Sequence, residues 1–191
     1  MINKYNFYKE LYYHEFQRKD GIDSSIGFPV TLFTLMVAGS FFLIEKIDFK
    51  NAFFGLGILN YIITTLIILF IISLIIAMFY LSKTYLNMIG KYNYLPFASE
   101  LQNREIELEE YYKEFYEEQE YSDKKKRNKI HISKEKAYID DLIGYYVDYS
   151  THNQEINDKR LKYHYRTRQF LVISLGILLL LTVSILINRG Q

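Results

Sequence analysis

Runs of apolar residues divide the chain into three segments that are long enough to cross a membrane. The longest extends from Phe53 to Leu81 and contains no Asp, Glu, Lys, Arg or His. A helix of this length, at about 1.5 Å rise per residue, crosses a hydrocarbon layer of about 30 Å. Shorter apolar runs extend from Ile26 to Ile44 and from Phe170 to Ile187. The pattern predicts an all-α membrane protein with three transmembrane helices.

The segment before the first apolar run has helical spacing of large side chains. Tyr5, Tyr8, Tyr12 and Phe16 recur at intervals of three or four residues. This spacing predicts an N-terminal amphipathic helix that lies in the membrane interface or packs against a later helix. Gly21 is expected to end that helix, and Asp23, Ser24 or Ser25 to cap the first span.

The polar segment between the second and third apolar runs is predicted to form a helical hairpin, or stalk. Ser99 begins a capping-box pattern, which predicts an acidic helix that continues to about Tyr121. The basic stretch 122–132 is expected to form the tip of the hairpin. Ser133 is expected to begin a second helix, which continues directly into the third span.

These patterns divide the chain into four parts. Residues 1–25 form the amphipathic helix, residues 26–82 a transmembrane hairpin with spans 26–44 and 53–81, residues 83–168 the helical stalk, and residues 169–191 the third span with a short tail.

The distribution of positive charge predicts the orientation of the spans. Sixteen of the 23 Lys and Arg residues lie between 83 and 169, and four more precede the first span. Only Lys46, Lys50 and Arg189 would lie on the opposite side. Because Lys and Arg favour the cytoplasmic side, we expect the N-terminus and residues 83–168 to be cytoplasmic and the C-terminus to be outside.

Four polar residues share one face of the helix that precedes the third span: Asn153, Asn157, Arg160 and His164. Their spacing of i, i+4, i+7 and i+11 places them in one stripe just below the membrane. The stripe could line a cytoplasmic vestibule or hold an anionic ligand through Arg160. Alternatively, it is the solvated or headgroup-facing side of the helix. Arg18 and Asp20 are expected at the same membrane depth and are candidate partners of the stripe.

Several polar residues lie inside the spans. They are Asn60, Thr64, Ser73, Ser174 and Thr182. They could line a narrow path, or they could bond neighbouring helices, which is a common role of such side chains in membranes. Since the core of each span lacks ionisable residues other than tyrosine, the usual chemistry of proton relays and coupled ions is not expected.

The chain offers little chemistry for an enzyme. It has no cysteine, and its four histidines are scattered. We find no metal-binding, phosphate-loop or nucleophile motif, and we assign no catalytic residue, metal or cofactor. The basic residues 124–129 lack interleaved aromatic residues, so nucleic acid is not an expected partner. The pairs Arg127/His131 and Arg160/His164 are similar to the Arg–His pair of HEPN-type RNases, but with a shorter separation than is usual in that family.

The segment YHEFQRKDGIDSSIGFPVTLFTLMVAGSFF, with the long helix after the second span, resembles the bacterial SLATT-type small membrane effectors. The resemblance covers most of residues 5–120, and the third span is additional to that family's two-span plan. It implies a multi-pass protein of the bacterial inner membrane that forms a homo-oligomer and takes part in antiviral defence. It also implies activation by a cytoplasmic signalling protein or a nucleotide second messenger.

Three functional hypotheses follow. The first is an inner-membrane effector that oligomerises and perturbs membrane integrity in response to a cytoplasmic signal or partner. The second is a non-enzymatic membrane anchor or accessory subunit, which would hold a cytoplasmic partner on the acidic face of residues 100–120. The third is a membrane-tethered HEPN-like RNase.

Overall fold

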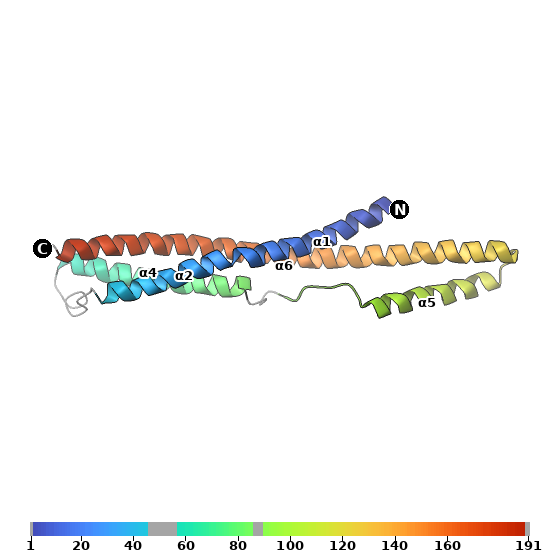
Figure 1. Ribbon diagram of the computed structural model, residues 1–191, viewed down its shortest axis with the longest axis horizontal. Coiled ribbons are helices and arrows are strands. Elements are labelled where there is room, and N and C mark those ends of the chain that lie inside the picture. The colour runs from blue at the N-terminus through green and yellow to red at the C-terminus, as the bar shows by residue number, and fades with distance from the viewer. Residues whose placement is uncertain (1, 46–56, 86–89, 190–191) are drawn as a thin grey trace. The chain divides into compact units, whose positions relative to one another are not determined.

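The computed structural model describes residues 2–45, 57–85 and 90–189, and these parts of the chain contain helices and no strand (Figure 1). The helices are α1 (Ile2–Ser25), α2 (Gly27–Ile44), α4 (Ile58–Tyr85), α5 (Ala98–Glu117) and α6 (Asp123–Arg189). Three helical segments are long and apolar enough to cross a membrane, within Lys4–Leu43, Ile58–Tyr85 and Asp123–Asn188. The prediction of an all-α chain with three potential spans is therefore confirmed.

The chain folds into two compact units. Residues 1–18 and 91–156 form one unit, which we call the polar unit, and residues 19–90 and 157–191 form the other, which we call the span unit. Helices α1 and α6 each contribute residues to both units.

Among its described residues, the span unit has two small apolar cores. Met36 of α2, Phe70 and Ala77 of α4 and Leu171 of α6 form the first, and Ile63, Leu181 and Ile185 form the second. Elsewhere the same helices expose large apolar side chains, including Ile75 at 62% and Leu179 at 60%. Contiguous exposed apolar surface on long helices is the surface that lipid covers, which is compatible with a multi-pass membrane protein.

The polar unit is held together largely by aromatic side chains. Tyr12 of α1 is buried, and its ring centroid lies 5.5 Å from that of Tyr146 of α6. The Tyr12 hydroxyl accepts a hydrogen bond of 3.1 Å from the Leu95 N–H, and Phe16 lies 5.2 Å from Tyr94. Burial raises the pKa of Tyr12, and neighbouring tyrosines add to that effect. Packing against a later helix, one of the two placements predicted for the N-terminal helix, is observed, and the placement in the membrane interface stays a prediction.

In the same unit, α5 lies antiparallel to the first turns of α6. The Arg104 Nε donates to Asp141 at 2.8 Å, while Tyr116 and Ser133 share a hydroxyl hydrogen bond of 3.0 Å further along. Lys134 reaches Glu105 at 3.1 Å. Beneath these polar contacts, Leu108 is the buried residue of α5.

The prediction that Gly21 ends the first helix is wrong. Helix α1 continues to Ser25, and α2 begins only two residues later. Glycine costs a helix only about 1 kcal/mol relative to alanine, and Ile22 and Ile26 are both buried just after it. Packing of these residues offsets the cost. Ser24 and Ser25 donate to carbonyls within α1 and do not cap the first span.

The starts predicted for the two later helices are also corrected. The basic stretch 122–132 is helical from Asp123, because the Ser122 carbonyl accepts the Lys125 and Lys126 N–H groups at 2.9 and 3.0 Å. An acidic residue in the first turn also favours a helix start there. Helix α5 begins at Ala98, where the Glu100 carboxylate accepts the Phe97 N–H at 3.1 Å.

Candidate functional site: a buried polar seam on the long helix

Buried residues recur along α6 at alternating intervals of three and four. They are Ile143, Tyr146, Ser150, Asn153, Asn157, Arg160, His164, Thr167, Leu171 and Ser174, followed seven residues later by Leu181 and then by Ile185; Ile156, outside this series, is buried as well. A seven-residue repeat of this kind keeps one face of a helix against its neighbours, as in a coiled coil. The six consecutive members from Ser150 to Thr167 are polar, and we call them the polar seam. None is more than 9% exposed.

Burial corrects one interpretation of the predicted stripe. Asn153 and Asn157 are 0% exposed, Arg160 is 3% and His164 is 5%. The stripe is therefore not a solvated or headgroup-facing side of the helix. Because burial of polar groups costs free energy unless they are paired, the partners of the seam decide whether it is stable.

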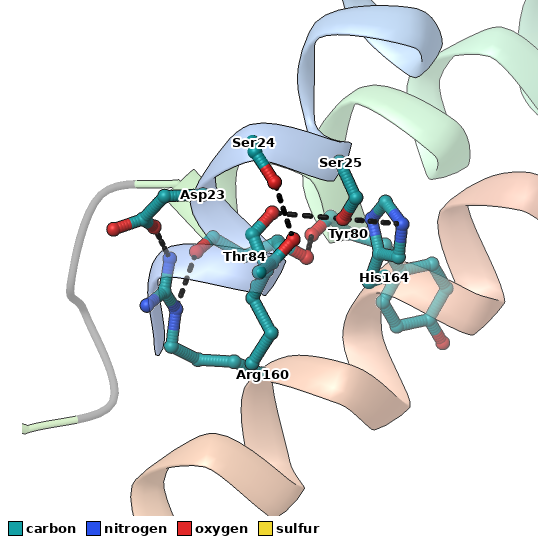
Figure 2. A network of polar contacts seen from close by, with 9 residues as sticks. Asp23, Ser24, Ser25, Tyr80, Thr84, Arg160 and His164 are labelled. Carbon is teal, nitrogen blue, oxygen red and sulfur yellow. Dashed lines mark hydrogen bonds and ion pairs between the residues drawn. The ribbon is translucent and has the colours of Figure 1, made fainter. Parts of the chain in front are cut away.

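Arg160 joins α6 to both α1 and α4 (Figure 2). Its Nε donates a hydrogen bond of 3.0 Å to the Thr84 carbonyl, and its Nη2 forms an ion pair with Asp23. Thr84 lies in the last turn of α4, where carbonyl groups lack partners within their own helix. The guanidinium thus donates a hydrogen bond to a carbonyl in the last turn of α4 and neutralises a carboxylate of α1.

One helical turn further along α6, His164 contacts α1 (Figure 2). Its Nε2 lies 3.2 Å from the Ser25 Oγ, and the Ser25 hydroxyl donates to the Ile22 carbonyl at 2.8 Å. Nε2 must therefore be the donor toward Ser25, which leaves the lone pair of the neutral imidazole on Nδ1. Nδ1 is buried and has no hydrogen-bond partner among the described residues. Burial, and to a lesser degree the charge of Arg168, lowers the pKa of His164.

In the polar unit, Asn153 fastens an irregular segment to α6. Its Oδ1 accepts the Asn93 N–H at 2.8 Å, and its Nδ2 donates to the Asn93 carbonyl at 3.0 Å. The adjacent His152 Nε2 lies 2.9 Å from the Lys91 carbonyl. Residues 90–97 are not helical, so their backbone N–H and C=O groups have no helical partners. The contacts with Asn153 and His152 provide hydrogen-bond partners for the backbone of Lys91 and Asn93.

The two partners predicted from membrane depth occupy other positions. Arg18 forms an ion pair of 2.9 Å with Glu15 of its own helix, and Asp20 is exposed. The carboxylate that pairs with Arg160 belongs to Asp23, one turn after Asp20. A hollow of about 270 Å³ beside this pair is lined by Lys19, Asp23, Ile26, Tyr85 and Arg160.

Within the spans, the Ser73 and Ser174 hydroxyls lie 2.6 Å apart and link α4 to α6. Both side chains are buried. Thr182 donates to the Leu178 carbonyl of its own helix at 2.8 Å, whereas Asn60 and Thr64 are half-buried. The helix-contact interpretation therefore holds for the serine pair.

Sequence reasoning missed Ser150, Asp23, Ser25, Thr84 and Thr167 as members or partners of the site. The signal for Ser150 and Thr167 was present in the spacing, because apolar residues continue the same three-and-four repeat on both sides of the stripe. Nothing in the local sequence identifies the other three, since they come from different helices.

Within the described parts of the chain, no group of three or more His, Cys, Asp or Glu side chains could hold a metal ion. Comparisons with protein families, curated proteins and solved structures found no match. Function must therefore be inferred from the polar seam and the spans themselves.

Proposed function

We propose that this chain is a non-enzymatic effector of the bacterial inner membrane, which oligomerises and perturbs membrane integrity when a cytoplasmic signal or partner acts on its stalk. In this proposal α2 and α4 form a transmembrane hairpin, and the apolar end of α6 is the third span. The N-terminus and residues 83–168 face the cytoplasm, and the C-terminus is outside. The resemblance to SLATT-type effectors supports a role in antiviral defence.

The continuity of α6 is the observation that carries the proposal. One helix of 67 residues contains the stalk residues, the polar seam and the third span. A change imposed on the stalk end of an unbroken helix is transmitted to the span by the helix itself. The seam occupies the end of the stalk part of this helix, just before the third span, where it can oppose or permit such a change.

The composition of the seam supports a switch more than a simple core. A buried ion pair adds less stability than well-packed apolar residues of similar volume, because both charges lose water. Charged pairs in such places can instead fix one register of the packed helices. In the resting state, Arg160 would hold α1 and α4 against α6, and a signal that weakens this contact would release them. Three spans are too few to enclose an aqueous path, so permeabilisation would require several copies.

The decisive experiment measures the membrane potential of bacteria while the expression level of the chain is raised in steps. The wild-type chain should depolarise cells above a threshold level in the membrane. Asp23→Asn should lower that threshold, because it weakens the contact that holds the resting state, whereas Asp20→Asn should leave it unchanged. An intact potential in cells that contain high membrane levels of both the wild type and Asp23→Asn would refute the effector proposal.

A second candidate function is an anchor for a cytoplasmic partner, and the exposed carboxylates of α5 favour it. Glu107, for example, has 64% of its side chain exposed, and Glu110, Glu114 and Glu117 are exposed as well. A basic partner would suit such a surface. This function predicts stable co-purification of one partner and no depolarisation. An RNase is the least supported alternative, because Arg160 and His164 are buried in contacts with Asp23 and Ser25. An RNase would lose activity in His164→Ala.

A further inference from the structure

The span unit contains a groove between the first turns of α2 and the apolar part of α6. Its volume is about 380 Å³, and it is lined by Phe28, Pro29, Leu32, Arg168, Leu171 and Val172. Pro29 and Leu171 are buried, whereas Phe28 is 71% exposed and Val172 66%. The lining thus combines a buried apolar floor with exposed apolar walls, and Arg168 is its one charged member.

The groove lies where α6 changes from polar to apolar and where the apolar helix α2 begins. Arg168 is the last charged residue before the apolar run that begins at Phe170, and Phe28 lies in the first turn of α2. In a membrane-embedded chain, this is the depth at which lipid headgroups meet acyl chains. A ligand in the groove would therefore meet a cation at headgroup depth and apolar side chains at acyl depth.

Arg168 differs in its pairing from Arg18 and Arg160, and it differs from the exposed Arg166 in lining the groove. Arg18 pairs with Glu15, and Arg160 pairs with Asp23. Arg168 is exposed, and it has no hydrogen-bond or ion-pair partner among the described residues. An unpaired guanidinium beside an apolar groove is complementary to an amphiphile with a planar or tetrahedral anionic head.

We propose that this groove binds an anionic phospholipid, with the lipid phosphate on Arg168 and an acyl chain against Leu32 and Leu171. A free phosphate would gain the single cation but none of the apolar contacts, whereas a zwitterionic lipid would carry its own cation beside the phosphate. The inference requires only that the spans lie in a membrane, and it is independent of the effector proposal.

The test is native mass spectrometry of the full chain in detergent, with phosphatidylglycerol or phosphatidylcholine added at equal concentration. The wild type should retain phosphatidylglycerol about fivefold more strongly, as expected for one basic residue near an anionic headgroup. Arg168→Gln should remove this preference, and Arg168→Lys should keep most of it. Arg166→Gln is the matched control, because Arg166 is exposed on the same helix but does not line the groove.

A second variant tests the acyl part of the site while the charge is retained. Val172→Trp should fill the exposed wall of the groove and reduce phosphatidylglycerol retention, and circular dichroism should show unchanged helix content. Glycerol phosphate at the same concentration should not displace the lipid. The proposal is overturned by an equal loss in Arg166→Gln and Arg168→Gln, by equal retention of the two lipids, or by displacement with glycerol phosphate.

Discussion

Arg160 is a buried cation that contacts residues of two other helices, α1 and α4. The Thr84 carbonyl and the Asp23 carboxylate both accept from it, yet the Asp23 side chain is 47% exposed. The free-energy cost of desolvation therefore comes mainly from the arginine. Removing the carboxylate would leave a buried charge without its counter-ion, which costs more than the pair itself contributes.

Asp23→Asn is expected to lower the free energy of unfolding by about 1–3 kcal/mol, below the range for a fully buried pair because Asp23 is partly hydrated. Arg160→Met should remove the desolvation cost, so the double variant should be more stable than the sum of the two single losses implies. Thermal unfolding in detergent measures this cycle, with Asp20→Asn as control. Additive losses would show that the two side chains do not interact.

His164 gives the polar seam a dependence on pH. Burial and Arg168 lower its pKa in the folded chain, so the unfolded chain takes up a proton first as the pH falls. Stability should therefore be complete above the ordinary histidine pKa of about 6.5 and should decrease as the pH falls from there toward the lowered value.

His164→Gln is expected to lose that part of the pH dependence. The free energy of unfolding of the wild type and of the variant would be measured at pH 7.5, 6.5 and 5.5. The difference between the two proteins at each pH removes the contribution of titratable groups that both contain. His131, with 72% of its side chain exposed, provides the control His131→Gln. If wild type and His164→Gln had parallel pH profiles, the imidazole would not be the responsible group.

At the scale of elements, α6 shows which features can be read from local sequence. Its apolar end and the stripe of Asn153, Asn157, Arg160 and His164 follow from hydropathy and helical period, which are properties of the chain alone. The burial of the stripe depends on residues distant in sequence. Arg160 pairs with Asp23 and not with Asp20, which lies one helical turn earlier. An estimate of membrane depth cannot distinguish two positions that are one turn apart.

The starts of the helices illustrate a different limit. Gly21 is a weak helix former, and the stretch 122–132 is expected to form a hairpin tip because of its run of charges, yet Gly21 and residues 123–132 are helical. Helix propensity is a weak prior that tertiary packing overrides, as the buried Ile22 and Ile26 show for Gly21.

The attachment of α5 to α6 is expected to depend on Leu108 more than on the surface ion pairs. Leu108→Ala should cost about 2–4 kcal/mol, because it deletes buried methyl groups. Lys134→Met should have a much smaller effect, because its partners Glu105 and Glu109 are 48% and 42% exposed, and ion pairs with such solvated carboxylates contribute little. Hydrogen exchange of the α5 amides would report both. Greater loss of protection in Lys134→Met would contradict this ranking.

At the scale of the whole molecule, hydropathy predicts that spans exist, but their orientation rests on the distribution of Lys and Arg. The absence of cysteine from the sequence makes that orientation directly measurable, because a single introduced thiol is the only one present. Ser122 and Asn188 are both exposed in the structure and lie near opposite ends of α6.

In spheroplasts, Asn188→Cys should react with a membrane-impermeant maleimide, whereas Ser122→Cys should react only after the membrane is permeabilised. This follows from the predicted cytoplasmic location of residues 83–168. Cys-free wild-type chain is the blank. Labelling of Ser122→Cys in intact spheroplasts would show that the orientation is the opposite of the predicted one.

The repeat of buried positions along α6 also constrains how the length of this helix can change. Each residue turns an α-helix by about 100°, so the deletion of a single residue after Tyr146 would rotate every later side chain away from its neighbours. Deletion or insertion of seven residues would return each side chain to within about 20° of its original direction. Viable length variants of α6, whether made by random mutagenesis or found in nature, should therefore differ in steps of seven.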